Sequence, residues 1–378
     1  MTPTTLRKQI IKARRIVIKI GTSTLTHRTG KLNFGLIDKL VREISDAVNQ
    51  GKEFILVTSG AVGVGMNKLA MCIKPKTIPE KQAAAAVGQG ILLHMYEKLF
   101  GEYGQTVAQV LLTKGDITDR KRYLNARNTF YTLLGMNIIP IVNENDTVAW
   151  EEIRFGDNDT LAALVAGLID ADLLIVLSDI HGVYTGNPQK NKNVKLIPII
   201  EEITPEIEAL AGGAVSQVGS GGMVTKIQAA KIASDSGIPM VIAYGGDPLV
   251  IREIMDGKEV GTLFVPKEYK LQQRKRWIAF GSEMQGSVVV DNGAAEAVIS
   301  MGKSLLPIGV VGIEGNFEAG AVVSIKTLEK REIARGIVNY NARDIKRIMG
   351  YNSREITEIL GFKDYDEIIH RNNMVLRV

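Results

Sequence analysis

Short apolar runs alternate with longer segments of helical spacing through the first 265 residues of the chain. The run at 15–21 is rich in β-branched residues and ends in glycine, as buried strands commonly do. Residues 33–51 instead carry apolar side chains at helical spacing and stop at a glycine. By the same criteria we predict strands at 53–61, 106–113, 137–143, 172–179 and 239–245, and helices at 81–100 and 222–237. Near-continuous apolar strands separated by helices predict an α/β fold, with a mainly parallel sheet sandwiched by helices.

The pattern changes near residue 265. Residues 266–276 form a basic connector, and short strands broken by glycine follow it. Such strands predict a small, mostly-β barrel of about a hundred residues. We therefore expect an α/β domain at 1–265, a linker at 266–276 and a mostly-β domain at 277–378.

Composition narrows the setting of the protein. The 378 residues are 45% hydrophobic and 23% charged, which is ordinary for globular domains. The single cysteine, Cys72, excludes an internal disulfide framework, and the histidines are scattered at His27, His94, His181 and His370. No apolar run reaches transmembrane length, and the N-terminus lacks a secretory core, so a cytoplasmic protein is expected. The net charge of +5 suits anionic small molecules.

Polar residues crowd into the stretch at 143–160, NENDTVAWEEIRFGDNDT, which follows a predicted buried strand. It holds six carboxylates and three asparagines. In parallel sheets, ligands bind beyond the carboxyl ends of the strands, where this stretch begins. The simpler alternative is an acidic surface loop, because loops after strands are usually polar.

Glycines and small residues also follow strand ends at 19–23, 58–65 and 218–226. Glycine lets backbone N–H groups approach an anion, and a following helix adds its positive end. Neither a P-loop motif nor the G-x-G-x-x-G order is present. A glycine often only makes a turn, but three such loops in one domain favour phosphate or carboxylate binding.

Two lysines and the acidic stretch together indicate phosphoryl transfer. Lys19 lies in an otherwise apolar strand, and Lys226 lies about one turn into a predicted helix. Either alone would more often be a solvated lysine, but together they can neutralise phosphate charge. The carboxylates of Glu144, Asp146, Asp157 and Asp159 are hard ligands of the kind that Mg²⁺ prefers, and Asn143, Asn145 and Asn158 can bind an ammonium and a carboxylate. An acceptor carboxylate is ionised at neutral pH, so the reaction would need no general base.

These motifs resemble the amino-acid kinase family, and within it the branch that phosphorylates the side-chain carboxylate of glutamate in proline synthesis. The resemblance rests on IVIKIGTS, FILVTSGAVGVG, IVNENDTV, RFGDNDTLAALVA, VLSDIHGVYTGNP and VGSGGMVTKIQAA, in family order across 15–245. Aspartokinases would be expected to open with K-x-G-G-T-S, where this chain has KIGTS. Residues 276–350 resemble the PUA module, an RNA-binding fold of tRNA-modifying enzymes. The resemblance implies an amino-acid kinase catalytic domain followed by a PUA-like domain.

Carried over residue by residue, the resemblance assigns a role to each matching position. Lys19 and Lys226 would stabilise the transferring phosphoryl group, and Asp159 would orient them and help to hold Mg²⁺. The glutamate site would comprise Ser59, Asp146, Asp157 and Asn158. ATP would be bound by Lys19, Ser178, Asp179, Ser220, Gly221, Gly222, Met223, Val224, Thr225 and Lys226.

The chain departs from the family pattern on the nucleotide side. Ser178 and Ser220 stand where threonine is usual, and His181 replaces an acidic residue. These departures bear on the details of nucleotide preference and not on the reaction.

The resemblance also implies partners. It implies ATP, Mg²⁺ and L-glutamate as ligands, feedback inhibition by proline, a dimer or tetramer, and transfer of the labile product to a glutamyl phosphate reductase. One alternative is another small-acid kinase, such as an acetylglutamate kinase, although NENDTV argues against it.

A second alternative is an RNA-binding protein that acts through its C-terminal module. Its support is the basic connector with Lys267, Lys270, Arg274, Lys275 and Arg276, which is otherwise read as a solvated linker. Aromatic residues suited to base stacking are sparse there, with Trp277, Phe280, Phe317 and Tyr340 as candidates.

Overall fold

The computed structural model describes residues 7–8, 10–27, 29–71, 73, 75–148, 157–186, 193–211, 222–267 and 284–376. The chain divides into two compact units, Met1–Glu268 and Tyr269–Val378. Most of the linker expected at 266–276 lies outside the described residues, so its bounds stay a prediction. Within the described part of the chain, no helix has the length and apolar character needed to cross a membrane.

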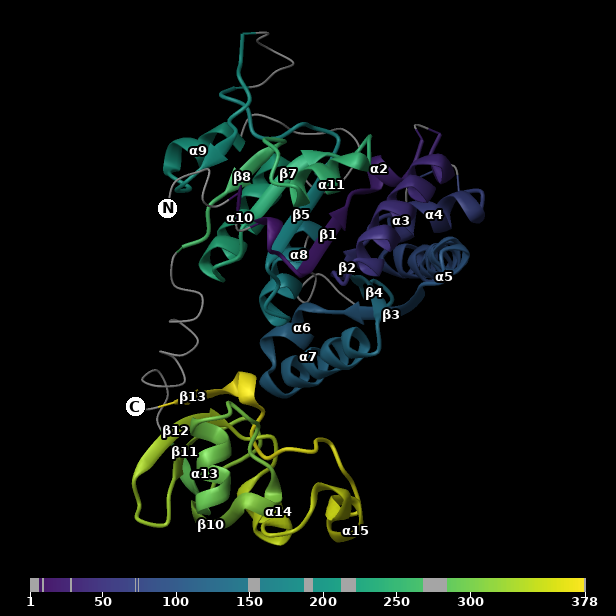
Figure 1. Cartoon of the computed structure of the whole chain (residues 1–378). Helices are drawn as coiled ribbons and strands as arrows, with labels where there is room; N and C mark the ends of the chain where they lie inside the picture. The colour runs from purple at the N-terminus through teal and green to yellow at the C-terminus, as the bar shows by residue number, and fades with distance from the viewer. Residues whose placement is uncertain are drawn as a thin grey trace. The chain divides into compact units, whose positions relative to one another are not determined.

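An eight-stranded sheet, counted over the described residues, forms the centre of the first unit (Figure 1). Its order is β3 (Thr106–Leu112), β4 (Ile138–Glu144), β2 (Glu53–Val57), β1 (Arg15–Ile20), β5 (Leu173–Ser178), β7 (Met240–Tyr244), β8 (Thr262–Phe264) and β6 (Ile199–Ile200). Neighbouring strands are parallel except for β7 and β8. The predicted α/β fold with a mainly parallel sheet is therefore confirmed.

Helices cover both faces of this sheet. They are α2 (Thr22–Leu25), α3 (Phe34–Asn49), α4 (Ala61–Lys68), α5 (Ile78–Glu102), α6 (Lys114–Thr118), α7 (Arg120–Gly135), α8 (Asn158–Leu168), α9 (Pro205–Ala211), α10 (Met223–Asp235) and α11 (Leu249–Met255). One apolar core lies under α3, α5 and α11, and the other lies under α7, α8 and α10. The sequence pattern assigned no element to 114–135, where α6 and α7 lie.

The alternation of side chains along β1 decides where Lys19 points. Ile16, Ile18 and Ile20 belong to the core beneath α3 and α5, whereas Val17 belongs to the core beneath α8 and α10. Because successive side chains of a strand point to opposite faces, Lys19 shares the face of Val17. The strand thus directs this lysine toward α8 and α10.

Two glycines of the first unit serve helix packing. A Cβ atom on Gly65 of α4 would lie 1.8 Å from the carbonyl oxygen of Ala84, and one on Gly88 of α5 would lie 1.7 Å from that of Ala61. Only glycine permits such a close approach of α4 and α5. Gly65 therefore has a packing role within the stretch that the sequence pattern assigned to anion binding.

The second unit contains a five-stranded sheet within its described residues (Figure 1). The order is β10 (Val310–Gly315), β9 (Gly286–Val290), β11 (Val322–Lys326), β12 (Glu332–Ile337) and β13 (Met374–Leu376). Its helices are α13 (Asn292–Ile299), η2 (Pro307–Gly309), α14 (Ala342–Ile348), η3 (Ser353–Glu355), α15 (Ile356–Leu360) and η4 (Arg371–Asn373). They pack with the sheet around the main core of the unit. The separate sheet expected for this unit is present, but the described helices hold at least as many residues as the strands, so the unit is less β-rich than the sequence pattern predicted.

Candidate active site

A buried cluster of two lysines around one aspartate lies at the carboxyl end of β1. Lys19 Nζ lies 2.5 Å from Asp159 Oδ1, and Lys226 Nζ lies 3.1 Å from Asp159 Oδ2. Lys19 and Lys226 are 5% and 6% exposed, and Asp159 is fully buried. Two ammonium groups thus share one carboxylate in a site of low dielectric constant. Paired ammonium groups of this kind can bind a phosphate.

The carboxyl group of Asp159 stays ionised in this cluster. Burial alone would raise its pKa, but the neighbouring Lys19 and Lys226 ammonium groups outweigh burial and hold the pKa below its usual range. Thr225 adds a hydroxyl that donates to Asp159 Oδ2 over 3.3 Å. The aspartate is therefore a fixed anion that holds both lysines in place.

The N-terminus of α8 positions this aspartate. Asp157 caps the helix, because its Oδ1 accepts a hydrogen bond from the backbone N–H of Asp159 over 3.0 Å. The same oxygen lies 4.0 Å from Lys19 Nζ. The two buried acceptors Asp157 Oδ2 and Asn158 Oδ1 have no hydrogen-bond partner among the described residues. Buried acceptors of this kind are usually satisfied, so they mark a place for a ligand.

A network of amides and hydroxyls lies on the β2 and β4 side of Lys19. Asn158 Nδ2 donates to the carbonyl oxygen of Thr58, to Ser59 Oγ and to Asn143 Oδ1 over 2.9, 3.0 and 2.9 Å. Asn143 in turn donates to Gln89 Oε1 over 3.2 Å. Gln89 also donates to the carbonyl oxygen of Glu144, which ties α5 to the end of β4. This network fixes the orientation of the Asn158 and Ser59 side chains toward a ligand.

Gln89 is a positioning residue that the sequence pattern did not identify. It is 6% exposed and sits within α5, where nothing in the sequence distinguishes it from a core residue.

We expect Gln89→Leu to raise KM for the acceptor acid by about tenfold, because two buried hydrogen bonds are lost, with kcat changed less than about threefold. Steady-state kinetics at saturating ATP measures this effect. Glu97→Ala, at an exposed position on the same helix, is the control. An unchanged KM for Gln89→Leu would show that Gln89 does not position the residues that bind the acid.

The β5 and β7 side of Lys19 has a different character. Ser178 ends β5 and donates to Asp179 Oδ1 over 3.0 Å. His181 and Tyr244 stack there with ring centroids 4.7 Å apart and an interplanar angle of 26°. Tyr244 is 41% exposed, so this aromatic pair is open to a ligand. Aromatic faces of this kind suit a nucleotide base.

The predicted loop before α10 is only partly described. Gly222 caps α10, and Met223, Val224 and Thr225 form its first turn, with Lys226 following. Ser220 and Gly221 lie outside the described residues. The N-terminus of α10 therefore lies at the site together with Lys226. The positive end of the helix dipole favours an anion there.

Asp146, a further predicted residue of the glutamate site, lies just beyond the strand that carries Asn143. It lies in the turn at 146–148, which follows β4, and Asn143 lies on that strand. Residues 149–156, which complete the acidic stretch, lie outside the described residues. The last part of the stretch is no loop, because α8 begins at Asn158.

The carboxylate oxygens of Asp157 and Asp159 suit a magnesium ion whose other ligands are waters and substrate phosphates. No group of three or more His, Cys, Asp or Glu side chains in the described part of the chain could hold a metal by itself. Both oxygens of Asp159 contact lysines, whereas the buried Asp157 Oδ2 has no hydrogen-bond partner among the described residues. Mg²⁺ is commonly bound through one or two carboxylates together with waters and substrate phosphates. Asp157 and Asp159 meet that requirement.

Fold and site together define a phosphotransferase, and comparison with known proteins identifies its class. The profile of the amino acid kinase family matches residues 14–244, and that of the PUA domain matches residues 286–360. The chain belongs to the amino acid kinase family. A solved carbamate kinase from Giardia lamblia, bound to AMP-PNP, covers 68% of this chain and 100% of its own, with a TM-score of 0.50. At 17% identity, this likeness shows the fold alone.

Relatives narrow the class further. The glutamate 5-kinase of Moorella thermoacetica is 57% identical over 376 residues, covering 100% of both chains. That of Geobacter sulfurreducens is 48% identical over 365 residues, covering 97% of this chain and 98% of its own. Within the amino acid kinase family, the chain therefore belongs with the glutamate 5-kinases.

Proposed function

We propose that this chain transfers the γ-phosphoryl group of ATP to the side-chain carboxylate of L-glutamate, which yields L-glutamyl 5-phosphate and ADP in the first step of proline synthesis. The observation that carries the proposal is the buried cluster of Lys19, Asp159 and Lys226 beside an amide network, in a chain 57% identical to a glutamate 5-kinase. The family implies the use of ATP. The residue roles below are part of the proposal.

The two sides of Lys19 suggest where each substrate lies. Sheet order places β2 and β4 on one side of β1, and β5 and β7 on the other. The first side offers Ser59 and Asn158, which suit the charged groups of an amino acid. The second offers the aromatic pair of His181 and Tyr244 for the base. The γ-phosphate would then lie between them, at Lys19 and Lys226.

The chemistry asks for charge stabilisation and alignment. An oxygen of the glutamate carboxylate, already ionised, bonds to the γ-phosphorus while the bond from that phosphorus to the bridging oxygen breaks, and the electron pair leaves with ADP. Lys19 and Lys226 stabilise the charge that develops on the phosphoryl oxygens. Asp159 keeps both ammonium groups aimed at that position. Asp157 and Asp159 would hold Mg²⁺, which would supply further positive charge when bound.

Substrate choice is tested by comparing acceptors. We expect ADP release with L-glutamate and none above background with N-acetyl-L-glutamate, because Asp146, Asp157 and Asn158 offer acceptors for a free ammonium group. A coupled ADP assay with each acid at equal concentration measures this. Turnover with the acetylated acid alone would retain the kinase chemistry and overturn the choice of substrate.

Asp146→Ala tests the predicted glutamate site. We expect KM for glutamate to rise by more than about tenfold, because an acceptor for the ammonium group is lost, while KM for ATP stays unchanged. Initial rates over a matrix of both substrates separate the two constants. An unchanged glutamate dependence would remove Asp146 from the substrate site.

Tyr244→Ala tests the nucleotide side. We expect KM for ATP to rise by about fivefold to a hundredfold, since stacking of one base is worth about 1–3 kcal/mol. The glutamate KM and kcat should hold. Tyr351→Ala, 49% exposed in the other unit, is the control. An unchanged ATP dependence in Tyr244→Ala would place the base elsewhere.

Several expectations about partners accompany this proposal. An acyl phosphate is labile, which favours rapid use of the product by a glutamyl phosphate reductase. Inhibition by proline would limit flux through the first step of its own synthesis. A dimer or tetramer and a cytoplasmic location complete the expectation.

A further inference from the structure

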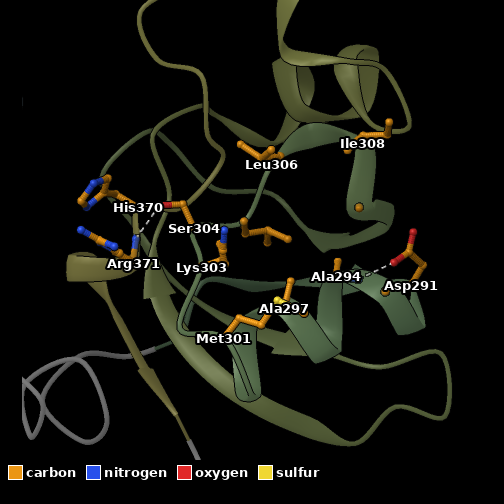
Figure 2. Close-up of a pocket in the computed structure, with 13 residues that line it drawn as sticks. Asp291, Ala294, Ala297, Met301, Lys303, Ser304, Leu306, Ile308, His370 and Arg371 are labelled. Carbon is orange, nitrogen blue, oxygen red and sulfur yellow. Dashed lines mark hydrogen bonds between the residues drawn. The ribbon is translucent and has the colours of Figure 1, made fainter.

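The second unit carries an open groove of about 720 Å³ between α13, the segment 303–309 and the turn at 370–371 (Figure 2). This volume lies within the range of sites that bind drug-sized molecules or short peptide segments. The groove lies outside the catalytic unit. Its occupant is therefore independent of the function proposed above.

Aliphatic side chains line the middle of the groove. They are Ala294, Ala297, Met301, Leu306 and Ile308. Met301, Leu306 and Ile308 are 62%, 42% and 52% exposed. Large apolar side chains that stand alone on a surface are ordinary, but a contiguous group of them marks an interaction site.

The two ends of the groove carry opposite charges. Lys303, His370 and Arg371 gather at one end, and Asp291 lies at the other (Figure 2). Lys303 and Arg371 are exposed, and neither has an ion-pair partner among the described residues. Asp291 already caps α13, because its Oδ1 accepts from the backbone N–H of Ala294 over 2.7 Å. The groove therefore offers two cations beside an aliphatic surface.

This chemistry does not favour RNA. Single-stranded RNA is commonly bound by aromatic side chains that stack on bases and by a surface rich in lysine and arginine. No aromatic residue lines the groove apart from His370 at its rim. The candidates Phe317 and Tyr340 are 3% and 2% exposed core residues, while Trp277 and Phe280 lie outside the described residues. Residues 286–376 hold 11 Lys and Arg against 12 Asp and Glu.

We propose that the groove binds a short acidic, amphipathic segment of another protein. Its aliphatic side chains would lie on Ala297, Met301 and Leu306, and its carboxylates would pair with Lys303 and Arg371. The complementarity of charge fixes the direction of the segment, and burial of the exposed apolar side chains supplies most of the affinity. Amphipathic segments bind grooves in other proteins in this way.

A peptide pair of opposite charge tests the proposal on the full-length protein. The probes are fluorescein-labelled Gly-Leu-Ala-Leu-Leu-Glu-Glu and the same peptide with two lysines in place of the glutamates. We expect the acidic peptide to bind saturably by fluorescence anisotropy, and the basic one about tenfold more weakly. The double variant Lys303→Glu, Arg371→Glu should reverse that preference, which a fold defect would not do.

Matched variants separate the groove from the rest of the unit. Leu306→Asp should weaken binding of the acidic peptide by about tenfold or more, whereas Leu328→Asp should not. Leu328 is 59% exposed and does not line the groove. The circular dichroism spectrum and the thermal unfolding of the second unit should be unchanged in all of these variants, which shows that they fold.

Several outcomes would overturn the proposal. They are absence of saturable binding up to millimolar peptide, and equal binding by wild type and the charge-reversed variant. Displacement of the peptide by a single-stranded RNA oligomer, with steep salt dependence, would assign the groove to nucleic acid instead. A groove-dependent dimer in sedimentation experiments would assign it to a second copy of this chain.

Discussion

Replacing Lys226 with alanine is expected to lower kcat by about a thousandfold while KM for glutamate changes less than about threefold. Lys226 Nζ contacts Asp159 in the buried cluster, at the start of α10. Its charge should therefore act on the phosphoryl group as negative charge develops, and not on the binding of the amino acid. Loss of one cation at such a position costs about 4 kcal/mol of transition-state stabilisation.

The control for Lys226→Ala lies on the same helix. Lys231 is 43% exposed and pairs with Glu208 at the surface, so Lys231→Ala should leave both constants unchanged. Lys226→Met, which keeps most of the side-chain volume, separates loss of charge from loss of packing. An increase in KM for glutamate with kcat preserved would contradict the role assigned to Lys226.

Asp159→Asn is expected to abolish turnover and to destabilise the catalytic unit. The substitution keeps the shape of the side chain but leaves two buried ammonium groups without their shared counter-ion. Breaking a buried pair in this way costs about 3–5 kcal/mol, which corresponds to a fall in Tm of roughly 10 °C for a domain of this size. Calorimetry measures the loss, and Asp235→Asn, which breaks the exposed pair with Lys267, is the control.

The stability lost in Asp159→Asn should depend on pH in a defined direction. The folded-state pKa of Asp159 lies below its usual value, so the ionised carboxylate stabilises the folded state above the unfolded pKa of about 4. That stabilisation is lost as pH falls through the folded-state pKa. The difference in free energy of unfolding between wild type and variant should be constant near neutral pH and shrink only below about pH 4. A difference that vanishes already at pH 6 would contradict the buried ion cluster.

The sequence could predict that Lys19 and Lys226 belong to the site, but not how they come together. An isolated lysine in the apolar run of β1 marked Lys19, and the glycine loop marked the start of α10 and hence Lys226. Their approach to a common carboxylate depends on the packing of α8 and α10 on one face of β1. Periodicity assigns a side chain to a face, but it does not choose which helices cover that face.

Other features carry no local signal. Gln89 reads as one more position of an alanine-rich helix, and its function depends on its distance from Asn143 in space. The helix α7 is rich in charged and polar residues, so its apolar stripe is weak and 114–135 received no assignment. The antiparallel strand β8 is only three residues long, below the length at which alternation can be recognised.

The most direct test of the account is to trap the product. The protein is incubated with Mg-ATP and L-glutamate in the presence of hydroxylamine, which converts an acyl phosphate to a hydroxamate. We expect γ-glutamyl hydroxamate in proportion to ADP, dependent on glutamate and about a thousandfold slower in Lys226→Ala. ADP release without any hydroxamate, or hydroxamate formation that survives in Lys226→Ala, would contradict phosphoryl transfer to the glutamate carboxylate at this lysine cluster.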